Sequence, residues 1–454
     1  MRKSVEDLVA DDQIADDQDM RRAHGKSHTS KFWKSLTHLG PGIITGCADD
    51  DPSGIGTYSV AGAQFGYGLL WLIPICVPMM IAVQEMCGRI AAITGQGLAA
   101  VLRDHYPRWL LWSALGFLSV ANIINVWADL NVMAASAAML FGLSLVTWLV
   151  IITAVTVALI IFVPYWQYVK FLKWLTLAFG AYAFVALMPE VHNNWAQIGR
   201  NLVIPHWNKD PAYVLTIVAF LGTTISPYLF FWQASETAED EVGAGHASPD
   251  GGRPKPVKKP EIVQIRMDTA IGMVVSQVIT FFIVICAAGT LNAHGMTDIN
   301  TAQDAAKALL PLGGKPAYWL FTLGMLGAGM LGIPTMAGSV AYALAETAGW
   351  RYGLYRRFNR AKQFYVAIAA VVFIGFALNF VHTFSPVKGL LYAAVINGVV
   401  APPLIVILMC ICNNRKIVKG RVNSALGNAV SAAAALLMAG TVVIMIWAMC
   451  SGKV

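Results

Sequence analysis

Residues 46–56 read Gly-Cys-Ala-Asp-Asp-Asp-Pro-Ser-Gly-Ile-Gly, within a segment that is otherwise hydrophobic enough to cross a membrane as a helix. A carboxylate at membrane depth costs about 2.5–3.5 kcal/mol even on the lenient insertion scale. Here Asp49, Asp50 and Asp51 follow one another with no adjacent Lys or Arg. Intramembrane acids without a basic partner indicate a functional site at which something else compensates their charge.

The same stretch predicts a break in the helix. Pro52 disfavours helical geometry at Asp51 and removes a backbone donor, and Ser53 and Gly54 are poor helix formers. Backbone carbonyls freed beside a carboxylate provide the oxygen ligands of a cation site. The alternative interpretation is a proline kink with acidic residues near a water boundary, which the position within the span disfavours.

The composition places most of the chain in lipid. Of 454 residues, 57% are hydrophobic and only 13% are charged, which is too apolar for a soluble domain. The run at 143–163 is apolar on every side, unlike the alternating strands of a membrane barrel. We therefore expect an all-α integral membrane protein. Its predicted spans are 40–63, 69–93, 110–139, 144–163, 168–188, 213–235, 268–292, 317–346, 363–382, 387–411 and 426–450.

The distribution of basic residues predicts the topology. Lys and Arg gather before the first span and in alternate connections, which places these segments and the N-terminus in the cytoplasm. With eleven spans the C-terminus lies outside, and we expect a multi-pass protein of the plasma membrane. The net charge of +7 then reflects topology and not nucleic-acid binding. The predicted units are a disordered cytoplasmic tail at 1–35, helices 1–6 at 36–241, a flexible cytoplasmic linker at 242–262 and helices 7–11 at 263–454.

A second break is predicted in the sixth span, at Thr223-Thr224-Ile225-Ser226-Pro227-Tyr228. Pro227 frees carbonyls there, and the hydroxyl groups add hard oxygen donors, which suit Mg²⁺, Mn²⁺ or Ca²⁺ better than soft metals. A plain helix kink is the alternative interpretation. Spans 1–5 and 6–10 then form two halves of opposite orientation, the inverted-repeat plan of many secondary transporters, with span 11 as an addition.

Polar residues elsewhere in the spans are weaker candidates. Asn122, Asn125 and Asp129 share one face of the third span and either line a hydrated path or bond neighbouring helices. Asn397 in the tenth span is an oxygen ligand or a packing residue. Where the sixth span leaves the membrane, we expect a solvated acidic face at Glu236, Glu239, Asp240 and Glu241.

Several motifs together resemble the Nramp divalent-metal transporters. These are Gly40-Pro41-Gly42-Ile43-Ile44, Asp51-Pro52, Gln84-Glu85 and the run from Arg89 to Leu98, and the likeness extends from about residue 35 to 412. The resemblance implies a LeuT-like 5+5 inverted repeat of about eleven transmembrane helices, with helices 1 and 6 broken. It also implies import of Mn²⁺ or Fe²⁺ together with protons.

The departures from that family's motifs carry further information. Gly54 stands where the family has Asn, and Thr223, Ser226 and Tyr228 stand where it has Ala, Met and His. In the third span Asp129 is kept, but the following Glu of the family is absent. These departures make the pattern similar to the Nramp-related magnesium transporters. A wider site with only oxygen donors fits Mg²⁺, which usually retains several waters.

The resemblance thus implies a transporter that imports partly hydrated Mg²⁺, and also Mn²⁺, by alternating access without tight proton coupling. The expected metal ligands are Asp51, Gly54, Thr223 and Ser226, with supporting or pathway roles for Ser53, Thr224, Tyr228, Asn125, Asp129 and Asn397. A proton-coupled Mn²⁺ or Fe²⁺ importer is the first alternative, and an organic-substrate symporter on the same fold is the second. The sequence offers no candidate nucleophile, pair of His ligands or nucleotide-binding loop, so we do not expect an enzyme. We expect a monomer in the lipid bilayer that needs no cofactor and no nucleic acid.

Overall fold

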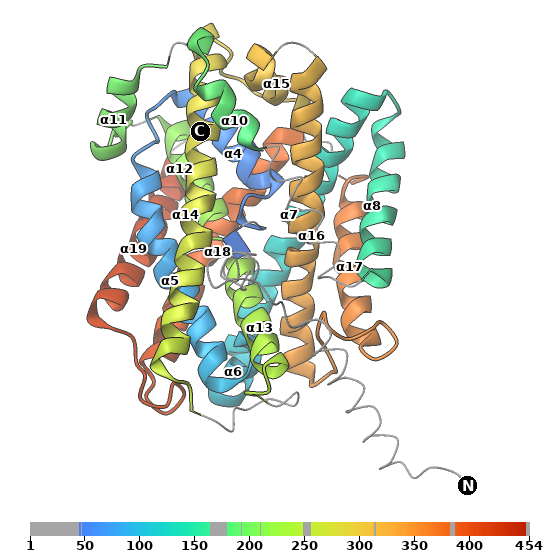
Figure 1. Ribbon diagram of the computed structural model, residues 1–454, viewed down its shortest axis with the longest axis vertical. Coiled ribbons are helices and arrows are strands. Elements are labelled where there is room, and N and C mark those ends of the chain that lie inside the picture. Colours follow the sequence, from blue (N-terminus) through green and yellow to red (C-terminus); the bar gives the residue numbers. More distant parts are fainter. Residues whose placement is uncertain are drawn as a thin grey trace, which may run out of the picture.

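The computed structural model describes residues 45–46, 48–163, 179–191, 193–208, 210–247, 256–312, 315–381 and 386–450. Within these ranges the chain forms helices and no strand, packed side by side in one bundle (Figure 1). Eight of the helices are long and apolar enough to cross a membrane. This confirms the predicted all-α membrane fold. The tail at 1–35, Cys47, the first part of the predicted fifth span and residues 248–255 of the linker lie outside the described residues.

The helices of the first half are α4 (Pro52–Phe65), α5 (Leu72–Thr94), α6 (Leu98–His105), α7 (Arg108–Phe141), α8 (Leu145–Phe162), α10 (Gly180–Ala186) and α11 (Trp195–Val203). Those of the second half are α12 (Pro211–Thr224), α13 (Pro227–Gly243), α14 (Lys259–Thr290), α15 (Ala302–Ala306), α16 (Lys315–Ala348), α17 (Lys362–Leu378), α18 (Pro386–Asn413) and α19 (Ala425–Cys450). The predicted spans overlap the longer helices, but the short helices α6, α11 and α15 lie outside every predicted span. α14 also begins earlier than expected, because Pro260 opens its first turn and the Glu261 carboxylate accepts from the Lys258 N–H at 3.4 Å.

Both predicted breaks are present. Residues 48–49 are helical, Asp50 and Asp51 are not, and α4 starts at Pro52. In the sixth span α12 ends at Thr224, and α13 starts at Pro227 after two non-helical residues. The residue before each proline has extended ψ angles, 171° at Asp51 and 132° at Ser226. This is the conformation that a following proline imposes.

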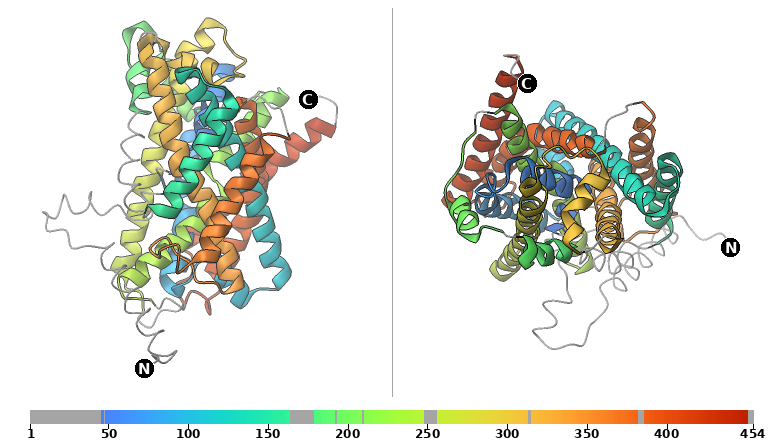
Figure 2. Two further views of the ribbon diagram at one scale, coloured as in Figure 1. Left: turned by 90° about the vertical axis from the view of Figure 1, so that its right-hand side faces the viewer. Right: turned by 90° about the horizontal axis from the view of Figure 1, so that it is seen from above.

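The broken helices lie in the interior of the bundle. α4 packs against α12, α14 and α18, and almost all of its residues are buried (Figure 2). α13 packs against α5 and α16. In Figure 1, α6 and the end of α13 lie at one end of the molecule, and α11 and α15 lie at the other. The bundle therefore encloses both breaks, away from its lipid-facing helices.

Glycines allow the closest helix contact in this core. A Cβ at Gly222 of α12 would lie 2.1 Å from the Ala394 carbonyl oxygen and 2.3 Å from the Gly398 nitrogen, both on α18. Reciprocally, a Cβ at Gly398 would lie 2.6 Å from the Val218 carbonyl oxygen. The two backbones touch because neither helix has a side chain at this point, which is the usual role of small residues between membrane helices.

We expect Gly222→Val to separate α12 from α18 and to destabilise the protein by about 1–3 kcal/mol or more, because the methyl groups meet backbone atoms that cannot rotate away. Thermal unfolding of the detergent-purified protein would show this as a lower midpoint. The matched control is Gly116→Val on α7, where an added Cβ has open space. Equal midpoints for both variants would contradict the proposed contact.

Candidate functional site

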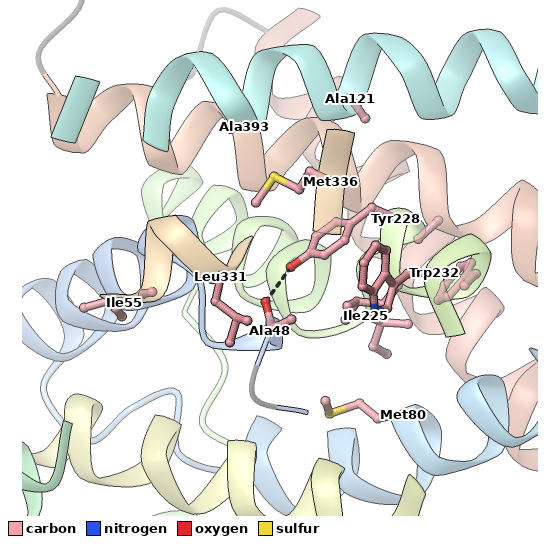
Figure 3. Close-up of a cluster of buried hydrophobic side chains, with 14 of the residues drawn as sticks. Ala48, Ile55, Met80, Ala121, Ile225, Tyr228, Trp232, Leu331, Met336 and Ala393 are labelled. Carbon is pink, nitrogen blue, oxygen red and sulfur yellow. Dashed lines mark hydrogen bonds between the residues drawn. The ribbon is translucent and has the colours of Figure 1, made fainter. Parts of the chain in front are cut away.

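Asp51 occupies the break in the first span and is held from two sides. Its Oδ1 accepts a hydrogen bond from the Gly54 N–H at 2.7 Å, which caps α4. Its Oδ2 accepts from the Tyr228 hydroxyl at 3.2 Å. The same hydroxyl lies 3.0 Å from the Ala48 carbonyl oxygen, the contact drawn in Figure 3. Tyr228, in the first turn of α13, thus joins the two broken spans to each other.

A second carboxylate lies next to Asp51. A Cβ built at Gly332 of α16 would lie 3.1 Å from Asp51 Cβ and 3.8 Å from Asp129 Oδ2, so both acids reach the same glycine. Asp129 comes from α7 and is fully buried, and neither of its carboxylate oxygens has a hydrogen-bond partner among the described residues. Two buried carboxylates without a basic partner favour a cation between or beside them.

The hydroxyl groups of the sixth span lie beside the start of α4 and within their own break. A Cβ at Gly54 would lie 3.4 Å from Thr223 Oγ1, so the Thr223 hydroxyl lies beside the first turn of α4. Ser226 Oγ donates within its own break, to the carbonyl oxygens of Gly222 at 2.9 Å and Thr223 at 2.7 Å, and keeps its lone pairs. Thr224 Oγ1 instead lies 3.0 Å from the Tyr58 hydroxyl on α4.

Ser53 also faces away from the carboxylate. Its hydroxyl donates to the Leu390 carbonyl oxygen of α18 at 3.3 Å. The structure therefore brings together Asp51, Gly54, Thr223 and Tyr228, with Ser226 at the adjoining break and Asp129 opposite. The side chain of Ser53 turns to α18, and that of Thr224 bonds Tyr58 further along α4.

The asparagines bond helices to one another. Asn125 Nδ2 donates to Asn397 Oδ1 at 3.0 Å, which joins α7 to α18. Asn122 Nδ2 donates to the Met336 carbonyl oxygen at 2.9 Å and to Ser339 Oγ at 2.8 Å, which joins α7 to α16. Of the two interpretations of these residues, interhelical bonding is the one that the contacts show.

Two residues of α16 that the sequence analysis does not single out lie near the site. Gly332 lets α16 approach both acids, and Met336, one turn later, has its methyl group 3.4 Å from the Cβ position of Gly332. Glycine and methionine are common in membrane helices, so no signal in the residue types distinguishes these two positions.

The expectation of a solvated acidic face is wrong for two of its members. Glu236 and Glu239 are 4% and 8% exposed. Glu239 Oε1 accepts from the Tyr342 hydroxyl at 2.5 Å and from the Leu354 N–H at 3.1 Å. The end of α13 is therefore covered by α16 and the segment that follows it, where the sequence suggested a water boundary.

All the residues gathered around Asp51 are shielded from solvent. Asp51 is 2% exposed, Thr223 and Ser226 are 1% exposed, and Asp129 and Tyr228 are fully buried. The carboxylate of Asp51 is nevertheless oriented, because the Gly54 N–H donates to one oxygen and the Tyr228 hydroxyl, shared with the Ala48 carbonyl, lies beside the other. The arrangement gathers buried oxygen atoms around an oriented carboxylate.

Comparisons with known proteins agree with this geometry. The family model described as natural resistance-associated macrophage protein-like (Nramp) matches residues 42–448. A divalent metal cation transporter, MntH, of Brucella suis biovar 1 is 27% identical over 317 residues, which are 68% of this chain and 67% of that relative. The relative is named as a transporter and not as an enzyme, as expected for this chain.

Solved structures show the same fold. A manganese transporter of Eremococcus coleocola superposes with a TM-score of 0.72 at 15% identity, covering 94% of this chain and 88% of that one. Mhp1, a nucleobase-cation-symport-1 family transporter, superposes with a TM-score of 0.53 at 13% identity, covering 91% and 93%. The fold is thus the LeuT-like arrangement of two inverted halves with broken first and sixth helices. With the family model covering nearly the whole membrane region, this chain belongs to the Nramp family.

Proposed function

We propose that this protein imports divalent metal ions, chiefly Mg²⁺ and also Mn²⁺, as partly hydrated ions by alternating access. The observation that carries the proposal is the position of Asp51, an oriented, buried carboxylate at the meeting point of two broken helices. The relatives named as a divalent metal cation transporter and a manganese transporter support the class of substrate.

The backbone around Asp51 favours a cation held by oxygen atoms. The C-terminal end of α12, at Thr223 and Thr224, presents the negative end of its helix dipole and carbonyls without helical donors. Asp51 would supply the charge. The hydroxyl groups of Thr223 and Ser226 and the backbone carbonyls near Gly54 would supply further oxygens, directly or through water.

The choice of Mg²⁺ rests on what these positions lack. Gly54 has no side chain, and the Ser226 hydroxyl is bound to its own helix end, so neither position supplies an amide or thioether ligand beside Asp51. Mg²⁺ dehydrates reluctantly and is usually held with several waters still attached. Hard oxygen donors without a thioether at these positions suit such an ion. The membrane potential, at about 2.3 kcal/mol per charge per 100 mV, would drive a divalent cation inward with twice that free energy.

Alternating access requires the contacts that close the site to open in turn. The Tyr228 hydroxyl connects α13 both to Asp51 and to Ala48, before the break, so it would be released when one half of either broken helix moves. The non-helical residues at both breaks are suited to absorb that rotation. We place the N-terminus in the cytoplasm of a multi-pass protein of the plasma membrane, on the basic connections at one end.

A proton-coupled Mn²⁺ importer is the second candidate. Asp129 is buried beside Asp51 without a hydrogen-bond partner among the described residues, so it is placed to take up a proton when a metal binds nearby. The Met336 thioether near Gly332 offers a soft donor of the kind that favours transition metals.

Asp51→Ala is expected to reduce Mg²⁺ and Mn²⁺ uptake into proteoliposomes at least tenfold, because it removes the charge that compensates the ion's lost water. The matched control, Asp304→Ala, changes an acid that pairs with Lys307 on the surface at 2.9 Å. We expect it to transport as the wild type does. Wild-type Mg²⁺ flux in the Asp51→Ala protein would refute the proposed site.

Ser226→Met is expected to lower Mg²⁺ uptake several-fold while Mn²⁺ uptake persists, because the thioether fills the water-holding space and is a softer ligand. Ser226→Ala separates loss of the hydroxyl from gain of the thioether, since it removes the first without adding the second. It should keep the wild-type preference for Mg²⁺ over Mn²⁺. Competition of Mg²⁺ against radioactive Mn²⁺ measures the shift. An unchanged Mg²⁺ to Mn²⁺ ratio in Ser226→Met would place the ion away from this residue.

Metal uptake without proton coupling should leave the pH of the liposome lumen unchanged. A luminal pH dye, followed during Mg²⁺ and Mn²⁺ uptake at an imposed membrane potential, makes this measurement. Acidification that accompanies metal entry, and that disappears in Asp129→Asn, would support the proton-coupled alternative instead.

A further inference from the structure

The consecutive acids of the first break face two different helix surfaces. Asp51 lies against α13 and α16, as described above. Asp49 and Asp50 instead meet Ser276 of α14: its hydroxyl lies 2.6 Å from Asp49 Oδ2 and 3.3 Å from Asp50 Oδ1. The segment is held firmly against this helix, because a Cβ at Gly46 would lie 2.5 Å from the Gly272 carbonyl carbon.

This second pair of acids is poorly satisfied. Asp49 and Ser276 are fully buried, and Asp50 is 2% exposed. One hydroxyl carries one proton, so Ser276 can donate to only one of the two carboxylates at a time. The other oxygens, Asp49 Oδ1 and Asp50 Oδ2, have no hydrogen-bond partner in the described part of the chain, and neither acid forms an ion pair there. Burying such groups is costly unless a cation or protons neutralise them.

A further unpartnered group lies on the same face of α14. Thr280 follows Ser276 by one helical turn, so the two side chains project together. The Thr280 hydroxyl is fully buried and has no hydrogen-bond partner among the described residues. It lies beside Tyr58 of α4, whose hydroxyl meets Thr224 Oγ1 at 3.0 Å and which is close enough to both acids to interact with their charges. Hydroxyl groups of α4 and α14 therefore lie near the two carboxylates.

We propose that Asp49, Asp50, Ser276 and Thr280 form a second cation site, distinct from the position at Asp51, that binds a hard divalent ion. Two carboxylates balance the charge of one such ion, and two hydroxyl groups provide neutral oxygen ligands. All these donors are oxygen, which selects Mg²⁺, Mn²⁺ or Ca²⁺ over soft metals. The site goes beyond the proposed function and shares with it only the class of ion.

The second site would change how an ion leaves the first. Asp49 is close enough to Asp51 for their charges to interact, so two ions bound at once would repel each other. Repulsion between neighbouring sites lets each bind well enough to fill and weakly enough to empty. The three consecutive acids would then bind two ions at neighbouring sites, Asp51 at one and Asp49 with Asp50 at the other.

The test is the number of Mn²⁺ ions bound per chain, measured by equilibrium dialysis and Mn²⁺ electron paramagnetic resonance on the full-length protein in detergent. We expect about two ions for the wild type, and about one for Asp49→Asn with Asp50→Asn, which keeps the side-chain shape. The double substitution Ser276→Ala with Thr280→Val should lower the affinity for one of the two ions at least tenfold. This second variant keeps all three acids and covers the case in which the neutralised pair fails to fold.

The matched control is Thr290→Val on the same helix, whose hydroxyl donates to the Cys286 carbonyl oxygen at 2.6 Å and faces neither acid. It should bind two ions with wild-type affinity. A count of one in the wild type, or a count of two that the Asp49 and Asp50 substitutions leave unchanged, would overturn the second site. The measurement is repeated with Na⁺ in place of choline in the buffer. If Na⁺ then displaces one bound Mn²⁺, the second site binds a monovalent ion, which would contradict the proposed divalent site.

The outcome also separates this inference from the proposed function. Asp51→Asn should remove the other ion and leave the one that depends on Ser276. If Asp51→Asn leaves two ions while the Asp49 and Asp50 variant loses one, the second site stands and the proposed transport site fails. If the wild type binds one ion and Asp51→Asn abolishes it, the proposed site stands and the second site fails.

Discussion

The structure depends on burying negative charge at the first helix break without a basic side chain to neutralise it. Two features of the backbone reduce the cost. Asp51 caps the N-terminus of α4 and lies against the first turn of α13 through Tyr228, so the positive ends of two helix dipoles point toward it. Pro52 and Pro227 each start one of these helices where a missing N–H is harmless. The same local chemistry that breaks the helices thus creates the place for the acid.

Close packing around the breaks shields this place from solvent and fixes the positions of the helices around it. Gly222 and Gly398 bring α12 and α18 into backbone contact, and Gly332 admits both Asp51 and Asp129 beside α16. Asn125 holds α7 to α18 through Asn397. Small residues and amide pairs replace the hydrophobic effect as the forces between helices in lipid, because lipid is as apolar as the side chains that it contacts. The site is therefore defined by contacts between helices that are far apart in the sequence.

The three consecutive acids at the first break contact different helices. A regular helix would place Asp49, Asp50 and Asp51 about 100° apart, but the break at Asp50 and Asp51 lets the chain send two of them to α14 and one toward α13 and α16. Ser276, Thr280 and Tyr58 then surround one group, and Tyr228, Gly332 and Asp129 the other.

The sequence by itself determined the spans and the two breaks, because hydrophobic length and the steric effect of proline act locally. It also singled out Asp51, since an unpaired acid at membrane depth is costly wherever its neighbours lie. Only the tertiary structure decided where the side chains point. Ser53 turns to Leu390, Thr224 turns to Tyr58, and Glu239 is covered by Tyr342 and Leu354. These partners come from segments as many as 337 residues away, so no local pattern in the chain could have assigned them.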